Sequence, residues 1–323
     1  MPERIRIALG QFRELTDEQL TFAKQLGITD IQMNTPSLPG EKRWEFNDLV
    51  QLYQRCVDAG VTLAAIENVP VRFYEAAMLG LPGRDEAIEN YQYIIRCFGR
   101  IGIPILGYHW MPNSVWRTSR STPDRGGAQV TSFDMELAKD APYTHGRVFT
   151  AEEMWNNWVY FMKAVLPVAQ ESNVKLALHP DDPPVPMLGG VARIFGSFEG
   201  FKRAMDEFDS PYNSLDFCQG CWSEMMGPKL FDAIRHFAGR GRILYVHFRD
   251  VIGTVPKFQE TFIGRGNVDM WKALQVYRDS GFTGFILDDH VPRIVNDSPW
   301  GHRSRAYAIG YMQAMLDRLY AEG

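Results

Sequence analysis

Residues 6–34 read RIALGQFRELTDEQLTFAKQLGITDIQMN and contain one complete structural repeat. The apolar run Arg6–Gln11 is followed by Thr16–Gln19, whose threonine and glutamine have the spacing of a helix capping box. Apolar residues after the box recur at helical spacing. Gly27 then suits the left-handed position that follows a helix, and a second apolar run, Thr29–Asn34, begins. The stretch therefore predicts a strand–helix–strand unit.

The same alternation continues along the chain. Eight short apolar runs, most of them nearly continuous, are typical of parallel strands buried on both faces. They are Arg6–Gln11, Thr29–Asn34, Thr62–Asn68, Pro104–Trp110, Lys175–Pro180, Asn213–Cys218, Ile243–Arg249 and Gly284–His290. Eight strand–helix units predict an α/β fold, a (β/α)8 TIM barrel formed by residues 1–323 as one domain. A doubly wound open sheet is the alternative, but the first run is followed by no glycine-rich phosphate loop.

One connection is much longer than the others. Met111–Thr150 separates the fourth and fifth runs and has little regular pattern. Long unpatterned loops are usually functional or disordered, and loops that follow barrel strands lie on the catalytic face. We therefore expect a lid-like insertion at residues 111–150. A solvated excursion or a contact between subunits explains the pattern equally well.

Composition excludes several classes of protein. The 34 Lys and Arg residues against 39 Asp and Glu residues give a net charge of −5, which argues against a nucleic-acid partner. No apolar run approaches the ~20 residues of a membrane span, and the N-terminus lacks a signal-like segment. Four cysteines make no disulfide scaffold, so we expect reduced thiols and a cytoplasmic location. The aromatic content of 13 % suits a large core or the interface of a homo-oligomer.

Chemistry in such a barrel is expected where the strands end, because active sites lie at the carboxyl ends of the strands. The fifth, sixth and seventh runs end at His179, Cys218 and His247, and the eighth ends in Asp288–His290. Histidine, cysteine and aspartate are all metal-ligand types. A lone histidine or cysteine is more often part of the core, but the fold makes these four ends neighbours. The sequence therefore predicts a shared metal ion, with Cys221 of the Cys-Gln-Gly-Cys motif in a structural role.

Several motifs around these positions resemble the mannonate dehydratases of hexuronate catabolism. The motifs that carry the resemblance are Gln32–Pro36, Leu38–Gly40, Ala65–Asn68, Tyr108–Pro112, Trp116–Thr118, Leu178–Pro184, Phe217–Gly220, His247–Asp250, Gly264–Met270 and Asp288–His290. The resemblance implies a xylose-isomerase-like barrel that converts D-mannonate into 2-keto-3-deoxy-D-gluconate.

The resemblance also implies roles for individual residues. Its metal ligands match His179, Cys218, His247 and Asp289, with Mn2+ as the ion and Fe2+ as the alternative. A catalytic histidine next to the aspartate matches His290. A catalytic tyrosine best matches Tyr307, although the segment 301–307 departs from the position where the family places it.

A sugar acid is the expected substrate, and its dehydration requires a proton to leave C2, negative charge to build on the carboxylate, and hydroxide to leave C3. A cation and arginines can stabilise that charge, and a histidine can accept the proton. The candidates for the carboxylate are Arg117, Arg249 and Arg303, and those for the sugar hydroxyls are Asn34, Asn68 and His109. Arg249 also has a structural explanation, an ion pair with Asp250.

Other functions on the same barrel stay open. A sugar isomerase or epimerase would normally rely on carboxylates, often glutamates, at the fifth and eighth strands, where this chain has His179 and Asp289. A dehydratase of another sugar acid would differ in only a few contacts. A barrel that binds metal or sugar acid without catalysis is the third alternative.

Overall fold

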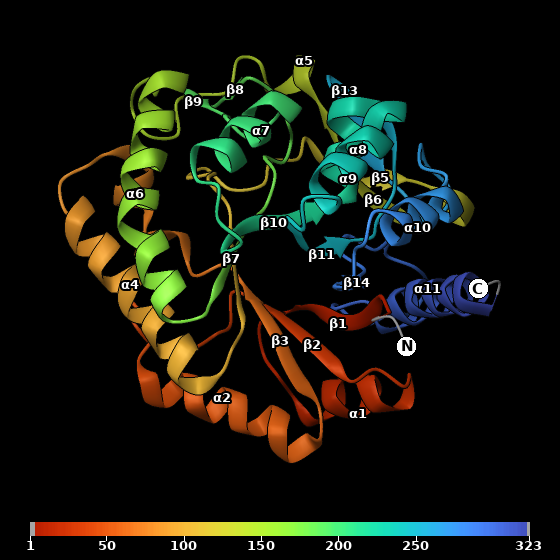
Figure 1. Cartoon of the computed structure of the whole chain (residues 1–323). Coiled ribbons are helices and arrows are strands. Elements are labelled where there is room, and N and C mark those ends of the chain that lie inside the picture. The colour runs from red at the N-terminus through yellow and green to blue at the C-terminus, as the bar shows by residue number, and fades with distance from the viewer. Residues whose placement is uncertain (1–3, 322–323) are drawn as a thin grey trace.

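The computed structural model describes residues 4–321, and eight parallel strands in this part of the chain close into a barrel (Figure 1). Around the ring, each strand pairs with the next strand of the barrel along the chain, and the last pairs with the first. The barrel strands are β1 (Arg6–Phe12), β2 (Asp30–Asn34), β3 (Thr62–Glu67), β4 (Ile105–Tyr108), β7 (Lys175–Leu178), β10 (Asn213–Cys218), β11 (Ile243–His247) and β14 (Phe285–Leu287). The predicted (β/α)8 fold and all eight predicted strands are confirmed.

Helices cover the outside of the barrel, as Figure 1 shows. The longer ones are α1 (Asp17–Gln25), α2 (Phe46–Ala59), α4 (Arg84–Ile101), α6 (Ala151–Glu171), α7 (Phe198–Glu207), α8 (Gln219–Met226), α9 (Leu230–Ala238), α10 (Met270–Asp279) and α11 (His302–Ala321). The predicted capping box is present at the start of α1, where Thr16 and Gln19 bond to each other's backbone amides. Among the described residues, no helix combines the length and the apolar character that crossing a membrane demands.

The inside of the barrel is closed below the catalytic face by tightly packed side chains. Small residues such as Ala65 and Ala177 belong to the same buried cluster as large ones, and the rings of Tyr245 and Phe285 stack with their centroids 5.1 Å apart. Gly107 of β4 is needed for this packing, because a Cβ at this position would collide with the Tyr245 hydroxyl. Within the described residues, the middle of the barrel is therefore a filled core and not a pore.

The long connection after β4 is more regular than its sequence indicates. It contains β5 (Ser119–Pro123), β6 (Gln129–Asp134) and the short α5 (Met135–Ala138). These strands join β12 (Val251–Thr254) and β13 (Lys257–Glu260) from the loop after β11, in the antiparallel order β12-β13-β6-β5.

The sequence of residues 111–150 gives little sign of these strands. β5 is largely polar and exposed, and β6 pairs with β13, more than 100 residues away, as well as with β5. Phe133 and Phe258 pair across this small sheet with their ring centroids 5.9 Å apart. A role for the segment as a lid stays a prediction.

Candidate functional site

A cavity of about 490 Å³ lies at the carboxyl ends of the barrel strands. Its size is within the usual range for small-molecule sites. The polar side chains that line it come from most of the strand ends. They are Gln11, Asn34, Thr35, Glu67, Asn68, His109, Ser114, His179, Asp182, His247, Asp289, His290 and Arg305.

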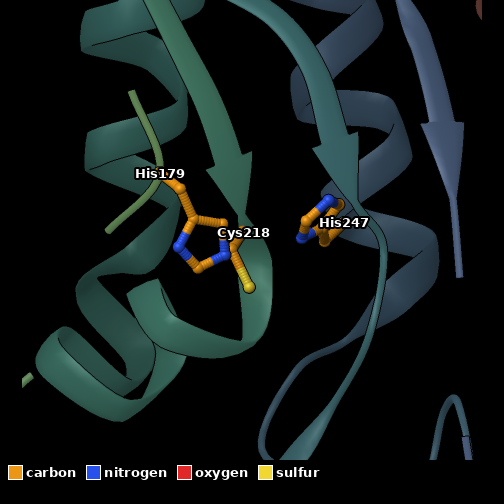
Figure 2. A group of neighbouring side chains, drawn as sticks. All are labelled: His179, Cys218 and His247. Atoms are coloured by element: carbon orange, nitrogen blue, oxygen red, sulfur yellow. The ribbon is translucent and has the colours of Figure 1, made fainter. Parts of the chain in front are cut away.

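Three of the four predicted metal ligands form one compact group beside this cavity. Ligand atoms of His179, Cys218 and His247 all lie within 4.8 Å of one another, on neighbouring strand ends (Figure 2). Cys218 and His247 are register partners in the β10–β11 pair. Asp289, which follows β14, places its Oδ2 3.7 Å from Nδ1 of His247. The structure thus brings all four residues to the same end of the barrel.

Hydrogen bonds orient both imidazoles toward this group. Nδ1 of His179 lies 2.6 Å from the carbonyl oxygen of Pro180, which can only accept, so Nδ1 carries a proton and Nε2 is the nitrogen left to bind a metal ion. Nε2 of His247 lies 2.9 Å from Oε2 of Glu67, while its Nδ1 is buried without a hydrogen-bond partner. Metal-binding histidines usually have this arrangement, in which one nitrogen is held by an acceptor and the other is free.

The charges around the group also fit a cation. Burial alone would lower the pKa of His179, but Asp216 and Cys218 raise it to about 10. The pKa of His247 is raised as well, because Asp216, Glu67 and Asp289 outweigh burial. Burial raises the pKa of the Cys218 thiol, yet its hydrogen bond with Cys221 and the charge of Arg249 bring that pKa well below the usual value. This negative environment, with two nitrogens, one sulfur and one oxygen, suits a divalent transition metal.

His290 stands at the edge of the cavity and is tied to a buried cluster of charges. Its Nδ1 lies 2.8 Å from Oε1 of Glu260. Glu260 also accepts hydrogen bonds from Arg117 at 2.8 Å and from Arg249 at 2.9 Å. Arg117 in turn bonds both carboxylate oxygens of Asp182, at 2.5 and 2.8 Å.

Arg117 and Arg249, the predicted partners of the substrate carboxylate, both lie in this charge cluster. Both guanidinium groups are almost fully buried and are paired with carboxylates of the protein itself, and neither lines the cavity. The structural explanation for Arg249, an ion pair with Asp250, is not observed among the described residues. Arg249 instead reaches Asp182, Glu224 and Glu260.

Arg303 and Tyr307 also lie outside the cavity. Arg303 is exposed on the first turn of α11. Tyr307 is 43 % exposed and packs edge-on against Phe262. The arginine that does line the cavity is Arg305, whose side chain is 7 % exposed.

Arg305 is the residue that the sequence reasoning missed in this segment. Successive residues of a helix are about 100° apart, so positions 303 and 305 point in roughly opposite directions. The place where α11 begins decides which arginine turns inward, and the sequence pattern does not fix that place. Arg305 is held by hydrogen bonds to Asp288 at 2.9 Å and to the carbonyl oxygen of Trp300 at 3.0 Å.

The predicted hydroxyl-binding residues Asn34, Asn68 and His109 all line the cavity. Asn34 donates to Gln11 at 2.8 Å and to Glu67 at 3.3 Å, so these side chains form one polar array. Burial lowers the pKa of His109 to about 3, which keeps its ring neutral. Gln11 and Glu67 were visible in the sequence as strand ends, but nothing there assigned them a role.

Apart from the groups that include His179 and His247, the ligand-type residues Asp182, Cys221 and Glu224 form another group, within the buried charge cluster. Arg249 contacts all three, with Nη2 3.2 Å from the Cys221 sulfur, and therefore supplies the positive charge there. Gly220 makes this possible, because a Cβ at that position would collide with the guanidinium of Arg249. The Cys-Gln-Gly-Cys motif thus joins a candidate metal ligand to a structural cysteine.

Comparisons with known proteins identify the family of the chain. The family model of D-mannonate dehydratase (UxuA) matches residues 10–148 and 143–322. The chain is 32 % identical to mannonate dehydratase 2 of Halalkalibacterium halodurans, over 99 % of this chain and 98 % of that protein. It is 31 % identical to the mannonate dehydratase of Thermotoga maritima, over 83 % of this chain and 82 % of the relative.

Solved structures give the same result. The crystal structure of mannonate dehydratase from Streptococcus suis serotype 2 superimposes with a TM-score of 0.89 at 28 % identity, covering 98 % of this chain and 93 % of that one. An L-ribulose 3-epimerase, at 14 % identity and a TM-score of 0.62, shares the fold alone. Because the family model matches nearly the whole of this chain, the chain belongs to the D-mannonate dehydratase family of hydro-lyases.

Proposed function

We propose that the protein removes water from D-mannonate to form 2-keto-3-deoxy-D-gluconate, with Mn2+ held by His179, Cys218, His247 and Asp289. The observation that carries this proposal is the convergence of His179, Cys218 and His247 beside a polar cavity that one arginine lines. Two neutral imidazoles, a thiolate and a carboxylate carry a charge of −2 in total, which balances a divalent ion. Because a thiolate also favours softer metals, Fe2+ is the alternative ion.

A bound divalent ion would stabilise negative charge on the substrate carboxylate and an adjacent hydroxyl. The chain itself provides the proton transfers. Nε2 of His290 accepts the proton from C2, since Nδ1 is held by Glu260. The protonated His290 passes this proton to the C3 hydroxyl, which leaves as water. The resulting enol becomes the 2-keto product when its C2 hydroxyl gives up a proton and C3 takes one up.

Other cavity residues hold the substrate in place. The guanidinium of Arg305 offers donors to the carboxylate. Asn34 and Asn68 offer amides to the hydroxyls along the sugar chain, and His109 contributes a neutral ring. The array formed by Gln11, Asn34 and Glu67 fixes the amides before the substrate arrives.

Replacing Arg305 is expected to weaken substrate binding. In Arg305→Lys, one positive charge remains beside Asp288, but the planar pair of donors is lost, so KM for D-mannonate should rise roughly 10-fold. The matched control is Arg303→Lys, two residues away on the exposed side of α11. Steady-state kinetics of Arg305→Lys and Arg303→Lys measure the two KM values. Equal KM values for the two variants would remove Arg305 from the substrate site.

The function itself is tested with chelated protein to which Mn2+ or Fe2+ is restored under reducing conditions. D-Mannonate should yield a 2-keto-3-deoxy acid, detected with semicarbazide, whose mass is lower than that of the substrate by one water. D-Gluconate, the C2 epimer, serves as the comparison substrate. A product of unchanged mass would indicate an isomerase or epimerase and contradict the proposal.

A further inference from the structure

Glu260 lies outside the barrel strands in the sequence, yet its side chain contacts a residue of the candidate active site, His290. It is the last residue of β13, in the small antiparallel sheet, and its side chain is 2 % exposed. The pairing of β13 with β6, through Phe258 opposite Phe133, fixes the strand that carries it. A segment outside the barrel thus delivers a carboxylate to the histidine that follows β14.

The contacts of Glu260 decide which nitrogen of His290 carries a proton. Arg117 and Arg249 both donate to Glu260, so the carboxylate is ionised and can only accept. Nδ1 of His290, 2.8 Å from Oε1, must therefore be the protonated nitrogen. Nε2, on a ring that lines the cavity, is then the nitrogen that can take up or release a proton.

We propose that Glu260 is a positioning residue for His290, which selects the imidazole tautomer able to accept a proton from the substrate. The inference rests on the proposed role of His290 as the base. Buried carboxylates that hold a catalytic histidine in this way act through orientation and tautomer, and their loss lowers kcat by up to about 10⁴-fold.

The neighbouring arginine makes the role of Glu260 specific. Nη2 of Arg117 lies 3.3 Å from the same Nδ1, but its protons are directed toward Asp182 and Glu260. Without the Glu260 carboxylate, Arg117 would donate to Nδ1 instead. The imidazole proton would then move to Nε2, and the lone pair would no longer face the substrate.

Glu260→Ala should therefore lower kcat for D-mannonate about 100-fold or more, while KM changes by less than about 3-fold. Glu260→Gln keeps an acceptor for Nδ1 and nearly the same shape, so its loss of kcat should be smaller, about 10-fold. Glu224→Ala is the matched control, because Glu224 is equally buried and pairs with Arg249 but does not contact His290. Its kcat should stay within about 3-fold of the unmodified protein.

Kinetics in a second background separate positioning from general damage. In a His290→Asn background, Glu260→Ala should cause no further loss of kcat, since the residue through which Glu260 acts is gone. Melting temperatures of the Glu260 and Glu224 variants show how much stability each variant loses when the charge cluster loses a carboxylate. Equal loss of kcat in both alanine variants would overturn the proposal.

A direct measurement does not depend on turnover. In protein labelled with 15N-histidine and loaded with diamagnetic Zn2+, NMR distinguishes protonated from unprotonated ring nitrogens, and His290→Asn identifies the signals. We expect the proton on Nδ1 in the unmodified protein and on Nε2 in Glu260→Ala. The same tautomer in both would overturn the role of Glu260, whereas absence of D-mannonate turnover in the unmodified protein would contradict only the proposed function.

Discussion

Cys218→Ser is expected to abolish turnover and to lower metal affinity by about 100-fold or more, with the fold retained. The thiolate is one of two negative charges in the proposed ligand set, and serine at that position is a neutral, weak ligand. Changes beside a metal ligand already cost 10- to 100-fold in affinity, so loss of a ligand should cost at least that much. Metal content after dialysis and turnover of D-mannonate measure both effects.

Cys56→Ser is the matched control for this variant. Cys56 is equally buried, on α2, and a serine there also introduces a hydroxyl into the core. Both variants should show similar losses in melting temperature, but only Cys218→Ser should lose metal. If Cys218→Ser kept its manganese and its activity, the cysteine would not be a ligand.

His290→Asn is expected to bind metal normally and to lose roughly 10²- to 10⁴-fold in kcat, the usual contribution of a general base. Asparagine retains some of the polar shape of the ring but cannot accept and return a proton. Because Asp289 and the other three ligands are unchanged, metal content should equal that of the unmodified protein. Kinetics and metal analysis on the same preparation check both parts.

Tyr307→Phe tests the second predicted catalytic residue in this region. The structure places Tyr307 outside the cavity, so its variant should keep kcat within about 3-fold. Full activity in His290→Asn, or a large loss in Tyr307→Phe, would reverse the assignment of the acid–base group.

The barrel and the candidate ligands could be predicted from local sequence. Runs such as Ile243–His247 are apolar to their ends, and the polar residue that ends each run then lies on the catalytic face because parallel strands share one direction. His179, Cys218 and His247 were found in this way without knowledge of any contact between them. The three residues lie next to one another because their strands, β7, β10 and β11, are adjacent in the barrel.

The surroundings of the ligands could not be predicted in the same way. Whether Arg117 and Arg249 meet a substrate or a protein carboxylate depends on Asp182, from the loop after β7, and on Glu260, from β13. The pairing of β6 with β13 is set by contacts between segments more than 100 residues apart and leaves no local pattern in either. Arg305 was hidden by the uncertain start of α11.

Anomalous diffraction from crystals of the manganese-loaded protein tests the central claim most directly. Data collected at the manganese absorption edge should give one strong peak per chain, bounded by His179, Cys218, His247 and Asp289 and open toward the cavity. A peak among Asp182, Cys221 and Glu224, or none at the four residues in a preparation that converts D-mannonate, would contradict the account.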